Sequence, residues 1–332
     1  MPNKITLPKI TVQASPDVAF IKYWGKKNEI ERIPENGSIS MILSGLHTTT
    51  TVEFSEKLSN DKIIINGKTA DKETKRVTEH LDRIRNLARV TFKARVVSEN
   101  NFPESTGLSS SSSGFAALTI AATLALALDL SEPELSILAR QASGSACRCV
   151  CGGIVEWIRG ETSSNSYAQT IFPADYWDLR DIVVVINSEK KKISSTAGHI
   201  TARSSIFFET RQKNIQDKIE KMKKIIAKKD FASFGELLEN ECLEFHSILF
   251  TSQPPLIMWQ AETLALFKEV MDMRNNGLPA YVTINTGHNV HIITLPKYQK
   301  DVMEKIKELN FVKKILLTKI GGKPVILDEH LF

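Results

Sequence analysis

The stretch SENNFPESTGLSSSSSGFAAL, residues 98–118, decides how the rest of the chain is interpreted. It runs from strand-like residues through a loop of glycine and serine into an apolar helix. Such a helix directs its unpaired N–H groups and the positive end of its dipole toward the loop, whose own N–H and hydroxyl groups point to the same place. The pattern predicts a phosphate-binding loop, to which we assign Gly107, Ser109, Ser110, Ser111 and Ser112.

A flexible Gly/Ser linker is the alternative interpretation of this loop, because serine runs are common in linkers. The segment FAALTIAATLALAL (115–128) follows directly, however, and it is a strong helix former that must be buried. No Lys follows Gly114, so the spacing is not that of a Walker P-loop.

A second segment of small residues lies downstream and ends in an arginine. A helix that begins at a capping box of Ser131 and Glu134 leads into this segment, and strand-like residues GGIVEW follow it. An arginine offers a planar fork that holds a carboxylate through two hydrogen bonds. Together the two segments predict a ligand with both phosphate and carboxylate groups, and the second segment contributes Ser143, Gly144, Ser145 and Arg148.

Upstream, a strand-like run over residues 9–21 ends in two lysines that flank two aromatic residues and a glycine. Such a set can hold an anion beside a flat aromatic wall, although a surface turn with a packed tryptophan is the alternative. The predicted binding residues are Lys22, Tyr23, Trp24, Gly25 and Lys26. Farther on, helical spacing of Val77, Leu81, Ile84 and Leu87 predicts a core-facing helix that leaves Arg76 to face elsewhere.

Composition limits the class of protein. The chain has 332 residues, enough for two domains, and its 42% hydrophobic and 24% charged content is typical of a soluble globular protein. The formal net charge of +5 suits an anionic ligand, but no basic stripe is interleaved with aromatics, so we expect no nucleic acid partner. The first residues lack a signal-peptide core and residues 115–128 are too short to span a bilayer, so we expect a cytoplasmic protein with no membrane partner.

The four cysteines do not form a disulfide framework. Three of them, Cys147, Cys149 and Cys151, would present their thiols to one face of a strand and could hold a metal there. No His or fourth Cys lies nearby, so buried thiols are the preferred interpretation and we assign no metal ligands.

The second half of the chain mixes long helices with antiparallel strands. A buried strand over residues 181–188 marks the expected domain boundary, with domains at 1–187 and 188–332. Helices are expected within 204–228 and 231–245, a strand–turn–strand unit at 280–295 and a last strand at 313–320.

These motifs, in this order, resemble the GHMP kinases and, among them, the diphosphomevalonate decarboxylases. The resemblance covers nearly the whole chain and rests on KYWGK at 22–26, the glycine–serine run, SGSACR with GGIVEW, Ser194-Ser195-Thr196 and the turn Gly287–Asn289. It implies an α/β (α+β) two-domain GHMP-kinase-like fold with the active-site cleft between the halves, usually as a homodimer. The ligand it implies is a small molecule of isoprenoid biosynthesis, a phosphorylated mevalonate.

The family's roles can be carried over residue by residue. Lys22 would lie beside the reacting 3-oxygen, Arg148 would hold the substrate carboxylate, and the serine loop would hold nucleotide phosphates. The substrate's 5-phosphate or its mevalonate body would contact Tyr23, Lys26, Arg76, Ser143, Ser145, Ser195 and Thr196.

One position departs from the family pattern. The family has an aspartate that acts on the 3-hydroxyl during phosphoryl transfer, and this chain has Asn285 there. An amide cannot accept a proton, and the loss of a positioned base commonly costs about 10²- to 10⁴-fold in rate. Elimination of a 3-phosphate together with CO2 needs no base, so the leading hypothesis assigns catalysis to Lys22, Arg148 and Asn285.

In that hypothesis, mevalonate 3,5-bisphosphate gives isopentenyl phosphate, CO2 and phosphate with no cofactor. The alternative is an ATP- and Mg-dependent diphosphomevalonate decarboxylase that forms isopentenyl diphosphate, and the intact phosphate loop favours it. A third interpretation is an inactive relative that binds phosphorylated mevalonate as a sensor or partner. A small-molecule kinase of the wider family is disfavoured by the missing aspartate.

Overall fold

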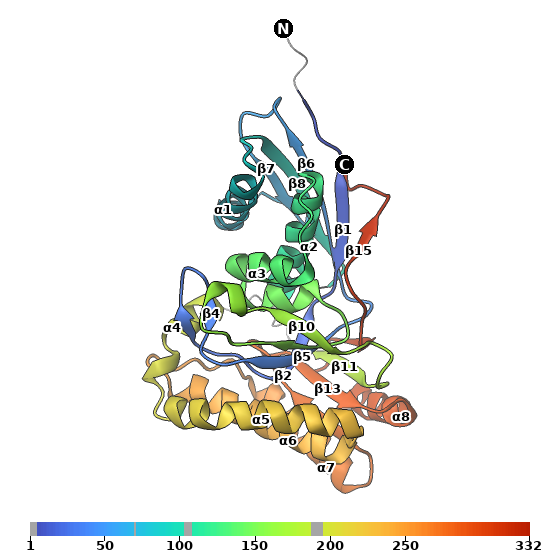
Figure 1. Cartoon of the computed structure of the whole chain (residues 1–332). Coiled ribbons are helices and arrows are strands. Elements are labelled where there is room, and N and C mark those ends of the chain that lie inside the picture. Colours follow the sequence, from blue (N-terminus) through green and yellow to red (C-terminus); the bar gives the residue numbers. More distant parts are fainter. Residues whose placement is uncertain (1–4, 70, 103–107, 187–194) are drawn as a thin grey trace.

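Two α/β halves are stacked end to end in the computed structural model, which describes residues 5–69, 71–102, 108–186 and 195–332 (Figure 1). The upper half holds a five-stranded sheet in the order β15-β1-β6-β8-β7. Its pairings are antiparallel except for that of β7 with β8. The strands are β1 Ile10–Ala14, β6 Thr48–Ser55, β7 Lys62–Ile65, β8 Lys93–Asn100 and β15 Val325–Leu327.

Three helices form a hydrophobic core with this sheet. They are α1 Asp71–Ala88, α2 Ser110–Ala125 and α3 Glu132–Ala142. Val52 and Val96 of the sheet pack in one buried cluster with Leu81 of α1, Ala121 of α2 and Leu138 of α3. The apolar run after the serine loop is therefore a buried helix, as its composition predicts, and it fixes the position of the loop.

A four-stranded antiparallel sheet lies in the middle of the molecule, in the order β10-β9-β5-β2. Its strands are β2 Asp17–Ile21, β5 Ser38–Ile42, β9 Ile154–Trp157 and β10 Ala168–Phe172. The single strand expected over 9–21 is two strands, β1 and β2, interrupted at Pro16, whose nitrogen cannot donate to a ladder. A small hairpin, β3 Lys26–Asn28 and β4 Ile33–Pro34, follows β2.

The lower half contains a further sheet, β12-β13-β11-β14, which is antiparallel, and four long helices. The strands are β11 Arg180–Val185, β12 Ala280–Thr283, β13 Val290–Thr294 and β14 Lys314–Lys319. The long helices are α5 Phe208–Lys228, α6 Phe231–Thr251, α7 Ala261–Asn275 and α8 Pro296–Lys307, and a short α4 spans Ser195–Ile200. Short 3-10 helices cover η1 Gly144–Val150, η2 Ser163–Asn165 and η3 Ala202–Ser204.

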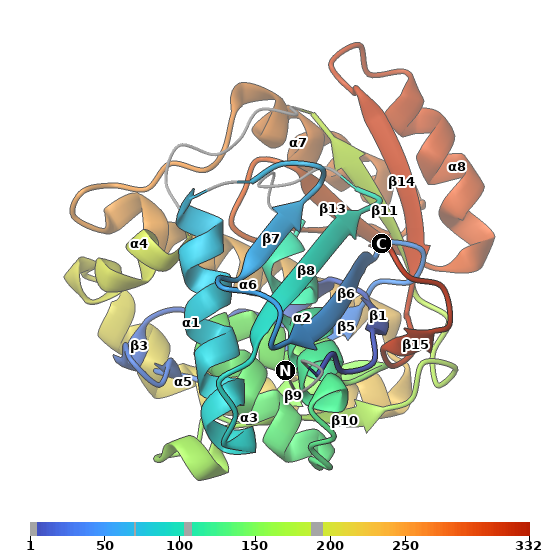
Figure 2. The same cartoon turned by 90° about the horizontal axis from the view of Figure 1, so that it is seen from above.

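The two halves are joined by more than one crossing of the chain. Leu43, after β5, forms a bridge with Ile320, after β14, and β15 returns to pair with β1 of the upper half. Figure 2, from above, shows β1, β6, β8 and β7 side by side, with β15 beside β1. The boundary predicted at 187/188 stays a prediction and falls outside the described residues. No helix in the described part of the chain combines the length and the apolar character of a membrane span.

Candidate functional site

The two serine segments of the sequence meet in space. Ser111 Oγ lies 3.3 Å from Ser143 Oγ, and Ser112 Oγ shares a 2.5 Å hydrogen bond with Ser145 Oγ. The first turn of α2 therefore faces the start of η1, which is a short 3-10 helix and not the open loop that was expected.

The start of α2 fits a phosphate group. Ser109, just before the helix, adopts the left-handed backbone (φ 56°), and the N–H groups of Ser110 and Ser111 belong to the first turn, which a helix cannot satisfy internally. Gly107 lies outside the described residues. The described residues contain no group of three His, Cys, Asp or Glu side chains that could hold a metal.

Tyr23 explains why the second segment contains Gly144. A Cβ at residue 144 would lie 2.4 Å from Tyr23 Oη and 3.4 Å from the ring of Trp157, so only glycine fits. The Tyr23 ring also stacks on His199, with centroids 4.5 Å apart. Burial raises the pKa of Tyr23, so the phenol stays neutral and can donate a hydrogen bond to a ligand.

Trp24 and Gly25 both contact His199, the residue on which Tyr23 stacks. Trp24 is 1% exposed and packs on His199 and Phe245, which matches the packed-tryptophan alternative, and its direct contact with substrate stays a prediction. Gly25 has φ +84°, and its N–H donates to His199 Nδ1 over 3.0 Å. That bond fixes the imidazole against Tyr23.

Lys22 is the most constrained cation of the site. It is 3% exposed, and its Nζ donates to Ala19 O (2.6 Å), Thr283 Oγ1 (2.7 Å) and Asn285 Oδ1 (3.2 Å). Three acceptors match the three donors of an ammonium group. Burial lowers the pKa of Lys22 to about 8, and the charge of Arg148 acts in the same direction.

A buried ion pair holds the backbone of Lys22. The Lys22 N–H donates to Glu241 Oε1 (2.9 Å), and the Lys22 carbonyl accepts from Arg211 Nη2 (2.8 Å), which also bonds Glu241 at 2.5 Å. No local pattern predicts this pair, because Arg211 and Glu241 lie on different helices, 30 positions apart.

Asn285 bridges Lys22 and the residue just before α2. Asn285 follows β12 and is half-buried. Its Oδ1 accepts hydrogen bonds from Lys22 Nζ and from the Ala19 N–H (3.3 Å). Its Nδ2 donates to Asp17 O (3.3 Å) and to Ser109 Oγ (3.4 Å). The side chain thus connects the buried lysine to the phosphate loop.

Arg148 is held by a partner that the sequence analysis did not name. Its Nε donates to Asp17 Oδ2 (2.7 Å) and its Nη1 to Ser38 Oγ (2.8 Å), and Asp17 is fully buried. Two of the five donors of the guanidinium are thereby used, and the predicted contact with a substrate carboxylate stays a prediction.

Two predicted phosphate contacts lie near the serines. Arg76 Nη2 is 3.5 Å from Ser111 Oγ and 3.4 Å from Ala142 O, and its guanidinium lies over the Phe115 ring. Lys26 is buried and forms a 2.5 Å ion pair with Glu29. Ser195 and Thr196 begin α4, but their side chains lie outside what the structure describes.

The cysteines are buried thiols. All four are free, and three lie on or just after η1 rather than on a strand. Burial raises the pKa of Cys147 to about 12 and that of Cys149 well above the ordinary value, so neither is an activated nucleophile.

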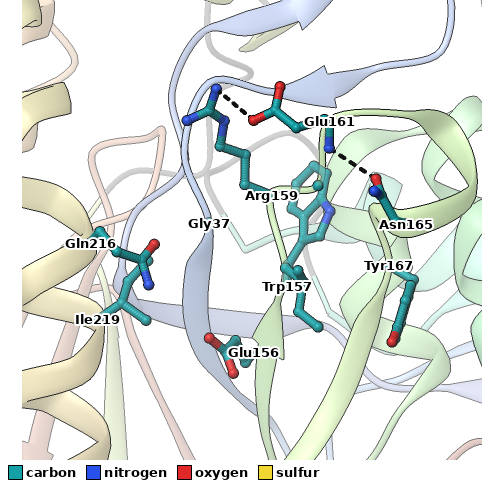
Figure 3. Close-up of a pocket in the computed structure, with 11 residues that line it drawn as sticks. Gly37, Glu156, Trp157, Arg159, Glu161, Asn165, Tyr167, Gln216 and Ile219 are labelled. Atoms are coloured by element: carbon teal, nitrogen blue, oxygen red, sulfur yellow. Dashed lines mark hydrogen bonds and ion pairs between the residues drawn. The ribbon is translucent and has the colours of Figure 1, made fainter.

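A separate cavity of about 480 Å³ lies between α5 and the β9–β10 strands (Figure 3). Its lining includes Glu156, Arg159, Glu161 and Gln216, and none of the predicted site residues. Trp157 lines it and also contacts Tyr23, with ring centroids 4.6 Å apart, so this indole separates the cavity from the site.

Comparisons with known proteins cover nearly the whole chain. Residues 14–168 match the diphosphomevalonate decarboxylase-like N-terminal domain, and residues 181–327 match the mevalonate 5-diphosphate decarboxylase C-terminal domain. A diphosphomevalonate decarboxylase of Aspergillus fumigatus is 32% identical, over 98% of this chain and 96% of the relative. A phosphomevalonate decarboxylase of Haloferax volcanii is 31% identical, over 97% and 98%.

Solved structures agree with these relatives. A crystal structure of mevalonate diphosphate decarboxylase from Staphylococcus aureus has a TM-score of 0.92 and 34% identity, with 98% of this chain and 99% of that chain covered. A structure described as MDDEF in complex with MVAPP, AMPPCP and magnesium has the same TM-score and identity, with coverage of 98% and 100%. The mixed α/β two-domain fold expected from the sequence is thereby confirmed.

Proposed function

Because this chain belongs to the diphosphomevalonate decarboxylase family, we propose that it releases CO2 and phosphate from a mevalonate that carries a phosphate on its 3-oxygen. The single observation that carries the proposal is the position of Lys22. This buried cation is held by three acceptors and joined through Asn285 to the phosphate loop.

The bonds of the elimination balance without a base. The C3–O bond breaks and its electron pair leaves with the phosphate, while the C1–C2 bond breaks and its pair forms the C2–C3 double bond as CO2 departs. Lys22 would stabilise charge on the leaving phosphate, and Arg148 would orient the carboxylate. Asn285, the weakest of the three acceptors of Lys22 by distance, would be the one exchanged for substrate.

An ATP-dependent diphosphomevalonate decarboxylase is the candidate that the comparisons favour over the leading hypothesis from the sequence. The relatives include diphosphomevalonate decarboxylases, and one similar structure holds MVAPP, AMPPCP and magnesium. In this chain, the start of α2 and the hydroxyls of Ser109 to Ser112 would hold the nucleotide phosphates. ATP, with Mg²⁺, would supply the 3-phosphate in this candidate.

A specific observation favours the second candidate, the ATP-independent decarboxylation of mevalonate 3,5-bisphosphate. Asn285 lies 3.2 Å from Lys22 Nζ, where a carboxylate would form an ion pair, and an amide can neither take the proton of the 3-hydroxyl nor neutralise Lys22. The charge of Lys22 is then available to a phosphate that arrives already attached to the substrate.

CO2 release in two parallel reactions distinguishes the candidates. One contains mevalonate 3,5-bisphosphate without nucleotide, and the other contains 5-diphosphomevalonate with Mg-ATP. Turnover of the diphosphate alone supports the ATP-dependent candidate, and turnover of the bisphosphate alone supports the second. Absence of CO2 in both reactions would refute the decarboxylase proposal and favour a binding protein.

A further inference from the structure

The β3–β4 hairpin is attached to the end of α3 by reciprocal arginine contacts. Arg32, in the turn of the hairpin, donates from Nε to Gln141 O (3.0 Å), and Arg140 of α3 donates from Nε to Glu31 O (3.0 Å). Arg76 of α1 reaches the next carbonyl of α3, Ala142 O. Two guanidinium groups from distant parts of the sequence therefore meet at consecutive carbonyls, where Figure 1 shows the hairpin beside α3.

Arg32 and Arg76 have no ion-pair partner in the part of the chain that the structure describes, whereas Lys26 is paired with Glu29. Burial lowers the pKa of Arg76, and the charge of Arg32 lowers it further. Glu73 and Glu79 of α1 act in the opposite direction, but no described carboxylate forms an ion pair with either guanidinium, so two positive charges lie near each other here.

Arg32 occupies a left-handed position in the turn of the hairpin. Its φ is +54°, in the left-handed region that L residues rarely adopt and that glycine or asparagine adopts more easily. Anchoring the hairpin uses one of the five donors of the guanidinium, and the described contacts leave the other four for a ligand.

The same corner carries neutral donors. Arg76 lies against Ser111, which faces Ser143, and Gly144 beside it supports Tyr23. We propose that Arg32 and Arg76 form a two-arginine clamp for the 5-phosphate of the substrate, with Arg32 as a specificity-determining residue. The inference rests on the proposed function. Two guanidinium groups without an ion pair among the described residues suit the charge of about −1.5 to −2 that a phosphate monoester carries at pH 7.

The test uses the full-length chain with Arg32→Gln and Arg32→Lys. Arg89→Gln is the matched control, because Arg89 also has a left-handed backbone (φ 55°) but is exposed at the end of α1. The KM and kcat of CO2 release are measured with the substrate that the wild type uses. Calorimetry measures the affinity for mevalonate 5-phosphate, which has no 3-phosphate to lose. Inorganic phosphate serves as a competitive inhibitor.

We expect Arg32→Gln to raise KM and to weaken the affinities for mevalonate 5-phosphate and for inorganic phosphate about 10- to 100-fold. Loss of a hydrogen bond to a charged group commonly has an effect of this size. The kcat should change less than about threefold. Arg32→Lys keeps the charge but not the fork and should lose less, and Arg89→Gln should behave as the wild type. A purely structural Arg32 would lower the melting temperature without changing the inhibition constant of phosphate.

The outcomes separate this inference from the proposed function. If the wild type releases CO2 and both Arg32 variants keep its KM and its phosphate inhibition, the clamp is refuted while the decarboxylase stands. If the wild type releases no CO2, the proposed function fails, and the calorimetric affinity for mevalonate 5-phosphate then tests the clamp. Weaker binding in Arg32→Gln supports the clamp, and equal binding, or none by the wild type, overturns it. Should Arg32→Gln not fold, the Arg32→Lys comparison carries the same decision.

Discussion

The substitution Asn285→Asp should raise the pKa of Lys22 and move the pH dependence of CO2 release. Burial holds that pKa at about 8 in the wild type, so Lys22 loses its proton, and with it the charge that stabilises the leaving phosphate, as the pH rises through 8. The rate should then fall about tenfold per pH unit above 8. Below pH 8 the ammonium persists and this group imposes no loss.

The size of the shift follows from the contacts of Asn285. A carboxylate oxygen in place of Oδ1, 3.2 Å from Lys22 Nζ, gives a Coulomb attraction of about 5 kcal/mol at an effective dielectric constant of about 20. The other carboxylate oxygen would take the place of Nδ2, which now donates to Asp17 O and Ser109 Oγ. The bond to Asp17 O would be lost, and the two oxygens would repel each other, which reduces the gain. Desolvation of the half-buried carboxylate reduces the gain further. We expect a net rise of about two pKa units, which corresponds to about 2.7 kcal/mol.

The assay is the pH profile of kcat/KM for CO2 release, measured between pH 6 and 10.5 on the wild type and on Asn285→Asp and Asn285→Ala. The descending limb should move from about pH 8 to near pH 10 in Asn285→Asp. Asn285→Ala removes Oδ1 without adding charge, so its limb should stay near 8. An unchanged limb in Asn285→Asp, or the same upward shift in both variants, would refute the assignment of the limb to Lys22.

Two further predictions concern packing and charge around the site. Arg148→Met leaves the fully buried Asp17 carboxylate without its partner and should lower the free energy of unfolding by about 3–5 kcal/mol in urea denaturation, with most of it regained in Asp17→Asn/Arg148→Met. Gly144→Ala places a Cβ 2.4 Å from Tyr23 Oη and should raise KM, and Tyr23→Phe should recover part of that loss. Equal kinetics of the single and double variants would contradict this steric explanation.

The sequence predicted those helices and loops whose signals lie in neighbouring residues. A serine loop before an apolar helix, and a capping box before α3, are read from neighbouring residues, and both helices are found. The meeting of Ser112 with Ser145 could be expected only from a shared ligand, because the two residues are held together by the packing of α2 and η1 in one core.

The supporting charges could not be predicted, because their partners lie far away in the sequence. Glu241 binds the backbone of Lys22 across more than 200 positions, and Arg32 reaches the end of α3 across more than 100. A single charged residue on a helix or in a turn gives no local sign of such a partner. Trp24 was assigned to a binding wall because it lies in a charged motif; the structure buries it in a cluster with Phe245, and its contact with substrate stays a prediction.

The two ends of the proposed substrate make different demands, and the cations are arranged accordingly. Phosphoryl transfer needs a base at the 3-hydroxyl. Elimination instead needs a cation at the leaving phosphate and a binding contact that holds the 5-phosphate end of the substrate. The structure fixes Lys22 through the Arg211–Glu241 pair and holds its ammonium with neutral acceptors, so its charge is positioned but not neutralised. Arg32 and Arg76 likewise lie without counterions among the described residues at the other end of the site. Asn285 is therefore the position on which the choice between the two candidate reactions depends, because a carboxylate there would supply the base and remove the free charge in one step.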